Sequence, residues 1–167
     1  TKENGVVTAT LTVRNTGSRD GAEVVQLYVK SNENSAVFKP ESELRAFRKV
    51  YLKAGEEKAV TLSFALSELA FWNVKENAWT LENGEYTIEA GASSEDIRMT
   101  APLTVTEGVT AMSPYPDNLN EKMRSAARIG NTEFATLLGS PLPDEPPVLP
   151  LTMESRFCDF QKTFMGK

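Results

Sequence analysis

The sequence predicts an all-β domain built from two packed antiparallel sheets, followed by a partly helical extension. Seven short segments with strand-like alternation lie in the first two thirds of the 167-residue chain, separated by turn residues and without long helical patterns between them. This arrangement is typical of a β-sandwich rather than of a fold in which strands and helices alternate. Seven of the nine prolines lie beyond residue 110, so we expect a second, unlike piece to begin near Glu107.

Three of the segments show the alternation most clearly. Residues 7–14 alternate between aliphatic side chains and threonine or arginine, residues 22–30 place three aliphatic side chains on one face, and residues 58–66 repeat the pattern. A period of two predicts strands with one buried face. Glycines in residues 15–21 and 54–57 mark the turns that precede two of these strands.

The remaining β segments are shorter or less regular. Residues 44–52 are rich in β-branched and aromatic residues, but Phe47 and Val50 lie on opposite parities, and we expect a bulge between them. Residues 67–72 predict a single helical turn whose first N–H groups are capped by the Ser67 hydroxyl. Three further strands are expected at residues 78–81, 86–92 and 97–105.

The extension differs in kind from the β segments. Its apolar residues suggest one or two short helices, broken at Gly130 and stopped at Gly139, because glycine tolerates the left-handed conformation of a helix C-cap. Residues 141–150 predict an extended proline-rich linker. An amphipathic helix with one apolar face is expected beyond it, from Met153, Phe157, Phe160 and Phe164.

Composition narrows the classes of partner. A net charge of −5 leaves no basic field, so we expect no nucleic-acid partner, and no apolar run reaches the roughly 20 residues of a membrane span. The chain starts without methionine, and residues 1–5 lack the shape of a signal peptide, which suggests an internal segment of a longer protein. The single Cys158 excludes an internal disulfide. This slightly favours a cytoplasmic over a secreted location, although many secreted enzymes use no disulfides, and the compartment stays open.

Four segments carry a recognisable signature. They are VRNTGSRDGAEVVQLYV (residues 13–29), ELRAFRKVYLKAGEEKAVTLSF (43–64), LAFWN (69–73) and NGEYTIEAGASSEDIRM (83–99). In this order and spacing they resemble the fibronectin type III-like domain of family 3 glycoside hydrolases, many of which are β-glucosidases. The chain departs from the family pattern at Ala46, where glycine usually precedes the phenylalanine. The resemblance implies an immunoglobulin-like β-sandwich over residues 1–106, with the linker and helical extension over residues 107–167.

The resemblance also implies a larger parent enzyme. Such an enzyme carries a catalytic barrel and an α/β domain, retains anomeric configuration and needs no cofactor, and its nucleophilic aspartate lies in a Ser-Asp-Trp motif. No such triplet occurs in this chain, because Trp72 follows Phe71 and Trp79 follows Ala78. We therefore expect no catalytic residue here, and the residues after Thr106 suit a parent in which the sandwich is internal.

The residues of this chain give little support for catalysis or metal binding by the chain alone. The chain has no histidine, which removes the usual base of nucleophilic pairs and the commonest transition-metal ligand, and Cys158 then lacks an activating partner. We expect no metal site. Glycoside hydrolysis needs two carboxylates about 5 to 10 Å apart. The carboxylates that we considered are mostly expected to be solvated: Glu23, Glu43, Glu82, Glu85 and Asp96.

Candidate contacts with carbohydrate or with other domains are Phe38, Lys39, Arg45, Trp72 and Trp79. Aromatic rings stack on sugars, but packing in the core or at its edge is the favoured interpretation of the two tryptophans. Arginines such as Arg45 can clamp carboxylates of another domain, although charged strand residues are more often solvated. The loop at residues 31–42 is the segment we expect to reach a substrate cleft, because long loops on rigid scaffolds commonly carry function.

Three functions remain open. The first is a non-catalytic accessory domain that braces the barrel and α/β domains of a β-glucosidase-type hydrolase and lends a loop to the cleft for a β-glucoside. The second is a free-standing carbohydrate-binding or adhesion module. The third is a structural spacer.

Overall fold

The computed structural model describes residues 1–31, 34–110, 112–125 and 127–143, which belong to two compact units, Thr1–Ile129 and Gly130–Lys167. The first unit contains the β-sandwich and helix α1, and the second contains helix α2. The residues beyond 143, with Cys158, most of the predicted linker and the predicted amphipathic helix, lie outside the described residues.

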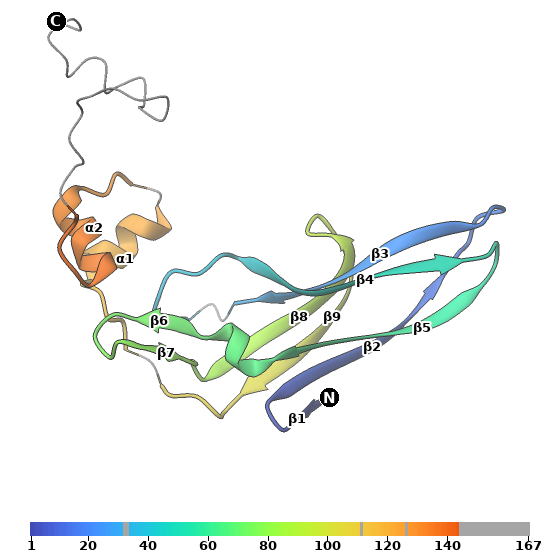
Figure 1. Ribbon diagram of the computed structural model, residues 1–167, viewed down its shortest axis with the longest axis horizontal. Helices are drawn as coiled ribbons and strands as arrows, with labels where there is room; N and C mark the ends of the chain where they lie inside the picture. The colour runs from blue at the N-terminus through green and yellow to red at the C-terminus, as the bar shows by residue number, and fades with distance from the viewer. Residues whose placement is uncertain (32–33, 111, 126, 144–167) are drawn as a thin grey trace, which may run out of the picture. The chain divides into compact units, whose positions relative to one another are not determined.

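The first unit contains two antiparallel sheets, as predicted (Figure 1). One sheet has the order β1-β2-β5, and the other has the order β4-β3-β8-β9. The smaller sheet consists of β1 (Lys2–Glu3), β2 (Val6–Arg14) and β5 (Glu57–Ala65). The larger consists of β3 (Gly21–Lys30), β4 (Ser42–Leu52), β8 (Gly84–Ser93) and β9 (Asp96–Val105). A separate hairpin consists of β6 (Phe71–Asn73) and β7 (Ala78–Thr80).

The core lies between the two sheets and follows the alternation in the sequence. Its fully buried side chains come from inward positions of both sheets, and Leu27, Val60 and Val105 are the largest of them. Burial of this apolar face is the main force that holds the sheets together. The all-β sandwich prediction is therefore confirmed.

The irregular strand and the single helical turn are both present, but the predicted position of the bulge and the predicted Ser67 cap were wrong. The irregularity in β4 falls at Arg45, because Leu27 pairs with Ala46 and the next residue, Tyr28, pairs with Leu44. Phe47 is simply on the outer face and is 68% exposed, so no bulge is needed between it and Val50. The helical turn is a 3₁₀ turn at Leu66–Leu69, capped by the Glu68 carboxylate, which accepts the Ala65 N–H at 2.9 Å.

The start of β1 and the end of β9 lie next to each other. The Lys2 ammonium donates to the Thr104 carbonyl at 2.9 Å and pairs with the Glu107 carboxylate at 2.8 Å. The Lys2 ammonium and the Thr106 N–H lower the pKa of Glu107 to about 2. This pair ties the first strand to the residues that follow the last strand.

Part of the extension belongs to the first unit. Helix α1 (Asp117–Arg124) buries Leu119, which is 2% exposed. Helix α2 (Asn131–Leu138) begins after Gly130 and ends at Gly139, whose φ of 74° is left-handed, as expected for a glycine C-cap. The domain boundary after residue 106 stays a prediction. In the described part of the chain, no helix is long and apolar enough to span a membrane.

Candidate functional site

Glu82 lies at the centre of the candidate site, buried between β7 and β8. One carboxylate oxygen, Oε1, accepts the Ala36 N–H at 2.6 Å. The other, Oε2, accepts the Ser35 hydroxyl at 2.7 Å and the Lys39 ammonium at 3.2 Å. The Glu82 and Lys39 side chains are only 4% and 8% exposed. A buried ion pair of this kind persists only where further hydrogen bonds satisfy the carboxylate, and Ser35 and Ala36 supply them.

The backbone around Glu82 is fixed by the chain that returns after β9. Glu82 forms an isolated parallel bridge with Val109, and the Val109 N–H donates to the Leu81 carbonyl at 3.0 Å. A Cβ atom at Gly108 would lie 2.3 Å from that carbonyl oxygen, so only glycine allows this close approach. The Tyr86 hydroxyl donates to the Glu82 carbonyl at 3.0 Å. The carboxylate is therefore held on a rigid backbone.

Two aromatic rings surround the Lys39 ammonium. The nitrogen lies 5.5 Å from the centre of the Phe71 ring and 5.6 Å from the centre of the Tyr86 ring, within the range of cation–π attraction. Burial raises the pKa of Tyr86 to about 12, and the Glu82 charge adds to the shift. The rings and the carboxylate together hold the cation away from solvent.

Helix α1 holds the same loop from its other side. The Asn120 side-chain amide donates to the Ala36 carbonyl at 3.1 Å, and the Arg124 guanidinium donates to the Ser35 carbonyl at 3.0 Å. The loop between β3 and β4, residues 34–41, is thus fixed by side chains from two distant parts of the chain. Charge-assisted bonds such as that of Arg124 are among the stronger hydrogen bonds in proteins.

The loop presents one aromatic ring to solvent. Val37 is 4% exposed and the Lys39 side chain points inward, whereas Phe38 between them is 44% exposed. The two sequence candidates in this loop therefore have different roles: Lys39 anchors the loop and Phe38 is available for contact.

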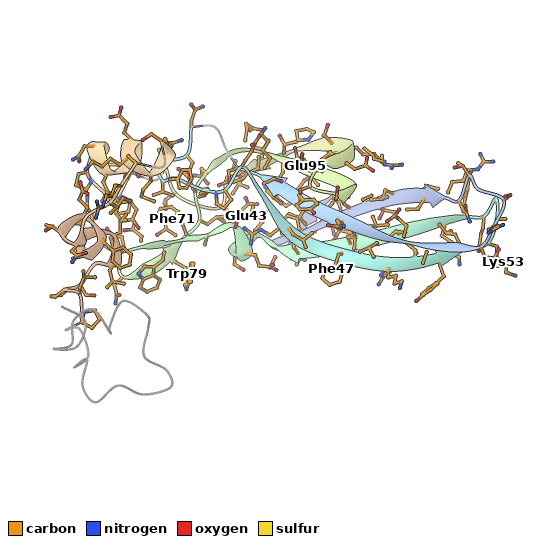
Figure 2. The ribbon with its side chains drawn as sticks, turned by 90° about the horizontal axis from the view of Figure 1, so that it is seen from above. Glu43, Phe47, Lys53, Phe71, Trp79 and Glu95 are labelled. Carbon is orange, nitrogen blue, oxygen red and sulfur yellow. The ribbon has the colours of Figure 1, made fainter. Side chains whose placement is uncertain are left out.

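The tryptophans are paired on the β6–β7 hairpin. Trp72 and Trp79 are opposite each other in the register, with ring centres 5.7 Å apart and planes at 75°. Trp72 is 41% exposed and Trp79 is 70% exposed, so neither ring fills the core, and packing at its edge stays a prediction. Figure 2 shows Trp79 at the surface of this hairpin.

Arg45 lies in the β4 irregularity rather than on a free surface. Its guanidinium pairs with Glu43 of the same strand at 2.8 Å, and its side chain is 16% exposed. It is therefore engaged within its own strand.

Most of the candidate carboxylates bind partners close to their own strands. Asp96 pairs with Arg98 at 2.6 Å, and Glu85 accepts the Thr104 hydroxyl at 2.9 Å. Glu82, which was expected to be solvated, is buried instead. Within the described ranges, no three acidic or cysteine residues gather in a way that would hold a metal ion. The arrangement holds a loop and presents aromatic rings, and it does not assemble an acid and a base across a cleft.

Sequence reasoning missed Glu82, Asn120 and Arg124 as parts of this site. Alternation predicts which face of a strand a residue occupies, but it carries no information about a loop 43 residues away.

Comparison with known proteins identifies the family to which the β-sandwich belongs. The family model of the fibronectin type III-like domain matches residues 23–94. The sandwich is therefore a fibronectin type III-like domain, and it is of the kind found in family 3 glycoside hydrolases.

Its relatives are much longer glycosidases. An exo-α-(1→6)-L-arabinopyranosidase of Bifidobacterium breve is 42% identical over 68% of this chain, and thermostable β-glucosidase B of Acetivibrio thermocellus is 35% identical over 74%. The matches span only 16% and 17% of these relatives. A crystal structure of a family 3 β-glucosidase of Bifidobacterium adolescentis matches 81% of this chain and 18% of its own, at 37% identity and a TM-score of 0.61. This chain thus corresponds to one domain of a larger protein.

Proposed function

We propose that this chain is a non-catalytic accessory domain of a β-glucosidase-type family 3 hydrolase. In this role it braces the catalytic barrel and α/β domains of the same protein and lends residues 34–41 to the cleft for a β-glucoside. The similarity to β-glucosidases supports the hydrolase assignment, and the carboxylate contacts described above support a role without catalysis.

The observation that carries the loop assignment is the buried Lys39–Glu82 pair. It fixes residues 34–41 in one shape without any ligand, and a preformed loop loses little conformational entropy when it meets a substrate. Phe38 is the exposed ring of this loop. An apolar ring next to a neutralised lysine is suited to stacking on a sugar ring or an aryl leaving group.

The test uses the intact hydrolase and nitrophenyl β-glucoside. Phe38→Ala removes the contacting ring, and Glu82→Gln weakens the anchor of the loop. Both variants should raise KM about fivefold and leave kcat within about twofold, because a stacking contact of about 1 kcal/mol acts on substrate binding. Glu85→Gln is the matched control, since Glu85 lies on β8 with its carboxylate on the exposed Thr104 hydroxyl, and it should change neither constant.

Unchanged KM in both variants would refute the role of the loop. The isolated 167-residue chain should show no turnover of the same substrate. Measurable hydrolysis by the chain alone would contradict the non-catalytic assignment.

A free-standing carbohydrate-binding module is the second candidate, and the exposed Trp72–Trp79 pair favours it. It predicts that the isolated chain releases heat on titration with cellobiose or a soluble β-glucan and that Trp79→Ala abolishes this heat. Absence of heat would exclude this function.

A further inference from the structure

The outer face of β4 carries large apolar side chains that nothing in the described structure covers. Leu44, Phe47 and Tyr51 are 46%, 68% and 65% exposed. Figure 2 shows Phe47 projecting away from the ribbon. β4 is an outer strand of its sheet, paired only with β3 among the described strands.

The irregularity at Arg45 brings these side chains onto one face. Leu44 and Phe47 are three positions apart and would lie on opposite faces of a regular strand. Because the register shifts by one residue, Leu44 pairs with Tyr28 and Phe47 pairs with Gln26. Tyr28 and Gln26 share the outer face, where their side chains are hydrogen-bonded to each other at 2.5 Å. The extra residue therefore produces a continuous apolar row, and bulges often re-aim side chains in this way.

The same strand is cationic although the chain is acidic. Strand β4 (Ser42–Leu52) contains three cations and one anion, whereas the whole chain carries a net charge of −5. Lys49 lies on the outer face, where its ammonium is 5.2 Å from the centre of the Tyr51 ring. Arg48 is also exposed, but it pairs with the buried Val25 and therefore lies on the other side of the strand. Neither cation forms an ion pair with any residue in the described part of the chain. We call Leu44, Phe47, Lys49 and Tyr51 the β4 face.

We infer that the β4 face is an interaction surface for an acidic, partly apolar surface on the catalytic domains of the same hydrolase. The inference rests on the proposed function, which makes this chain part of a larger protein. An exposed apolar row that carries the unpaired Lys49 ammonium complements such a surface in both hydrophobicity and charge. The related glycosidases are about six times longer than the part they share with this chain, so a large protein surface is available beside it.

Other occupants fit the β4 face less well. In a symmetric dimer the same patch meets itself, so both sides of the contact would contribute a Lys49 ammonium and neither would supply an acid from this face. Cations on an edge strand are a common device against such self-pairing. A nucleic acid would bind cations, but the net charge of −5 opposes its approach.

Hydroxyl-radical footprinting tests the inference, because it reports the exposure of individual aromatic side chains. In the isolated 167-residue chain, Phe47 and Tyr51 should be oxidised rapidly. In the intact hydrolase, both should be oxidised at least fivefold more slowly. Equal rates in the two proteins would overturn the inference.

Charge reversal tests the chemistry of the partner. The variant Lys49→Glu in the intact hydrolase should restore at least half of the oxidation rate of the isolated chain. Arg14→Glu is the control, because Arg14 is 62% exposed on the other sheet, and it should leave the protection unchanged. Tyr28 and Tyr86 are buried, so they stay protected from oxidation in a folded variant, and their oxidation would report unfolding. If the charge-reversal variant unfolds, Phe47→Ser serves as a milder variant, with the oxidation of Tyr51 as the readout. Protection that survives both variants would refute an acidic, partly apolar partner.

Two further outcomes separate this inference from others. Protection of Phe47 in the isolated chain that disappears on dilution would identify a second copy as the occupant and overturn the inference. If the Phe38 and Glu82 variants leave KM unchanged while Phe47 stays protected in the intact protein, the proposed loop function fails and the β4 interface stands.

Discussion

Replacing Lys39 with methionine removes the ammonium from Glu82 and keeps a side chain of similar length. In the variant, the Glu82 carboxylate keeps the Ser35 hydroxyl and the Ala36 N–H but loses its countercharge. Loss of one partner of a buried ion pair typically costs 3 to 5 kcal/mol. Because two neutral donors remain, we expect the low end, a decrease of about 3 kcal/mol in the free energy of unfolding.

Urea unfolding followed by tryptophan fluorescence measures this loss. Lys39→Met, Glu82→Gln and the double variant form a thermodynamic cycle, in which we expect a coupling energy of about 2 kcal/mol between the two side chains. Arg14→Met is the control, because the Arg14–Glu57 pair is 62% and 55% exposed, and its loss should cost less than about 0.5 kcal/mol.

The reasoning fails if Lys39→Met costs no more than Arg14→Met. It also fails if the double variant is destabilised by the sum of the two single effects, since the two charges would then not interact. Either result would mean that solvent or another residue compensates the Glu82 carboxylate.

Three further predictions concern other parts of the sandwich. The folded pKa of Tyr86 is about 12 and lies above the ordinary value of 10.0, so the contribution of this hydroxyl to stability is complete below pH 10 and is lost as the pH rises through 12. Urea unfolding at pH 9 to 12 should therefore show a steeper loss of stability with pH for the wild type than for Tyr86→Phe. Parallel curves for the two proteins would contradict the raised pKa. Lys2→Met should return the pKa of Glu107 from about 2 towards 4.5 in an NMR titration of side-chain carboxyl groups, and an unchanged value would show that Lys2 is not the cause. A Cβ atom at Gly91 would lie 2.2 Å from the Asp96 carbonyl oxygen, so Gly91→Ala should cost about 2 kcal/mol in urea unfolding, whereas Gly21→Ala, with open space around it, should cost far less.

The sandwich could be predicted from the sequence because each strand is recognisable from the alternation of its own residues. The inward residues of β2 and β5 alternate without interruption, and a strand with one buried face requires that alternation. The turn at Gly55 and the helix end at Gly139 could be predicted in the same way, because each depends on a glycine that adopts the left-handed backbone conformation at that position.

The candidate site could be predicted only in part. Lys39 and Phe38 were identified as loop residues, but their opposite roles depend on Glu82 and on helix α1, which are distant in the sequence. The exposure of Trp79 was missed because parity assigns a face to a residue and does not say whether another layer covers that face. The shift at Arg45 was misplaced for a related reason, since a bulge is defined by the partner strand.

The Lys2 contacts with Thr104 and Glu107 have a consequence for how such a domain can be carried within a longer polypeptide. The first strand of the sandwich and the residues at the end of its last strand are within hydrogen-bonding distance of each other. A host protein can therefore receive the sandwich in a surface connection without separating the two ends of that connection, and the entropic cost of closing the connection grows only slowly with its length. Relocation of this module among hydrolases of different domain order would then require little change in the domains on either side.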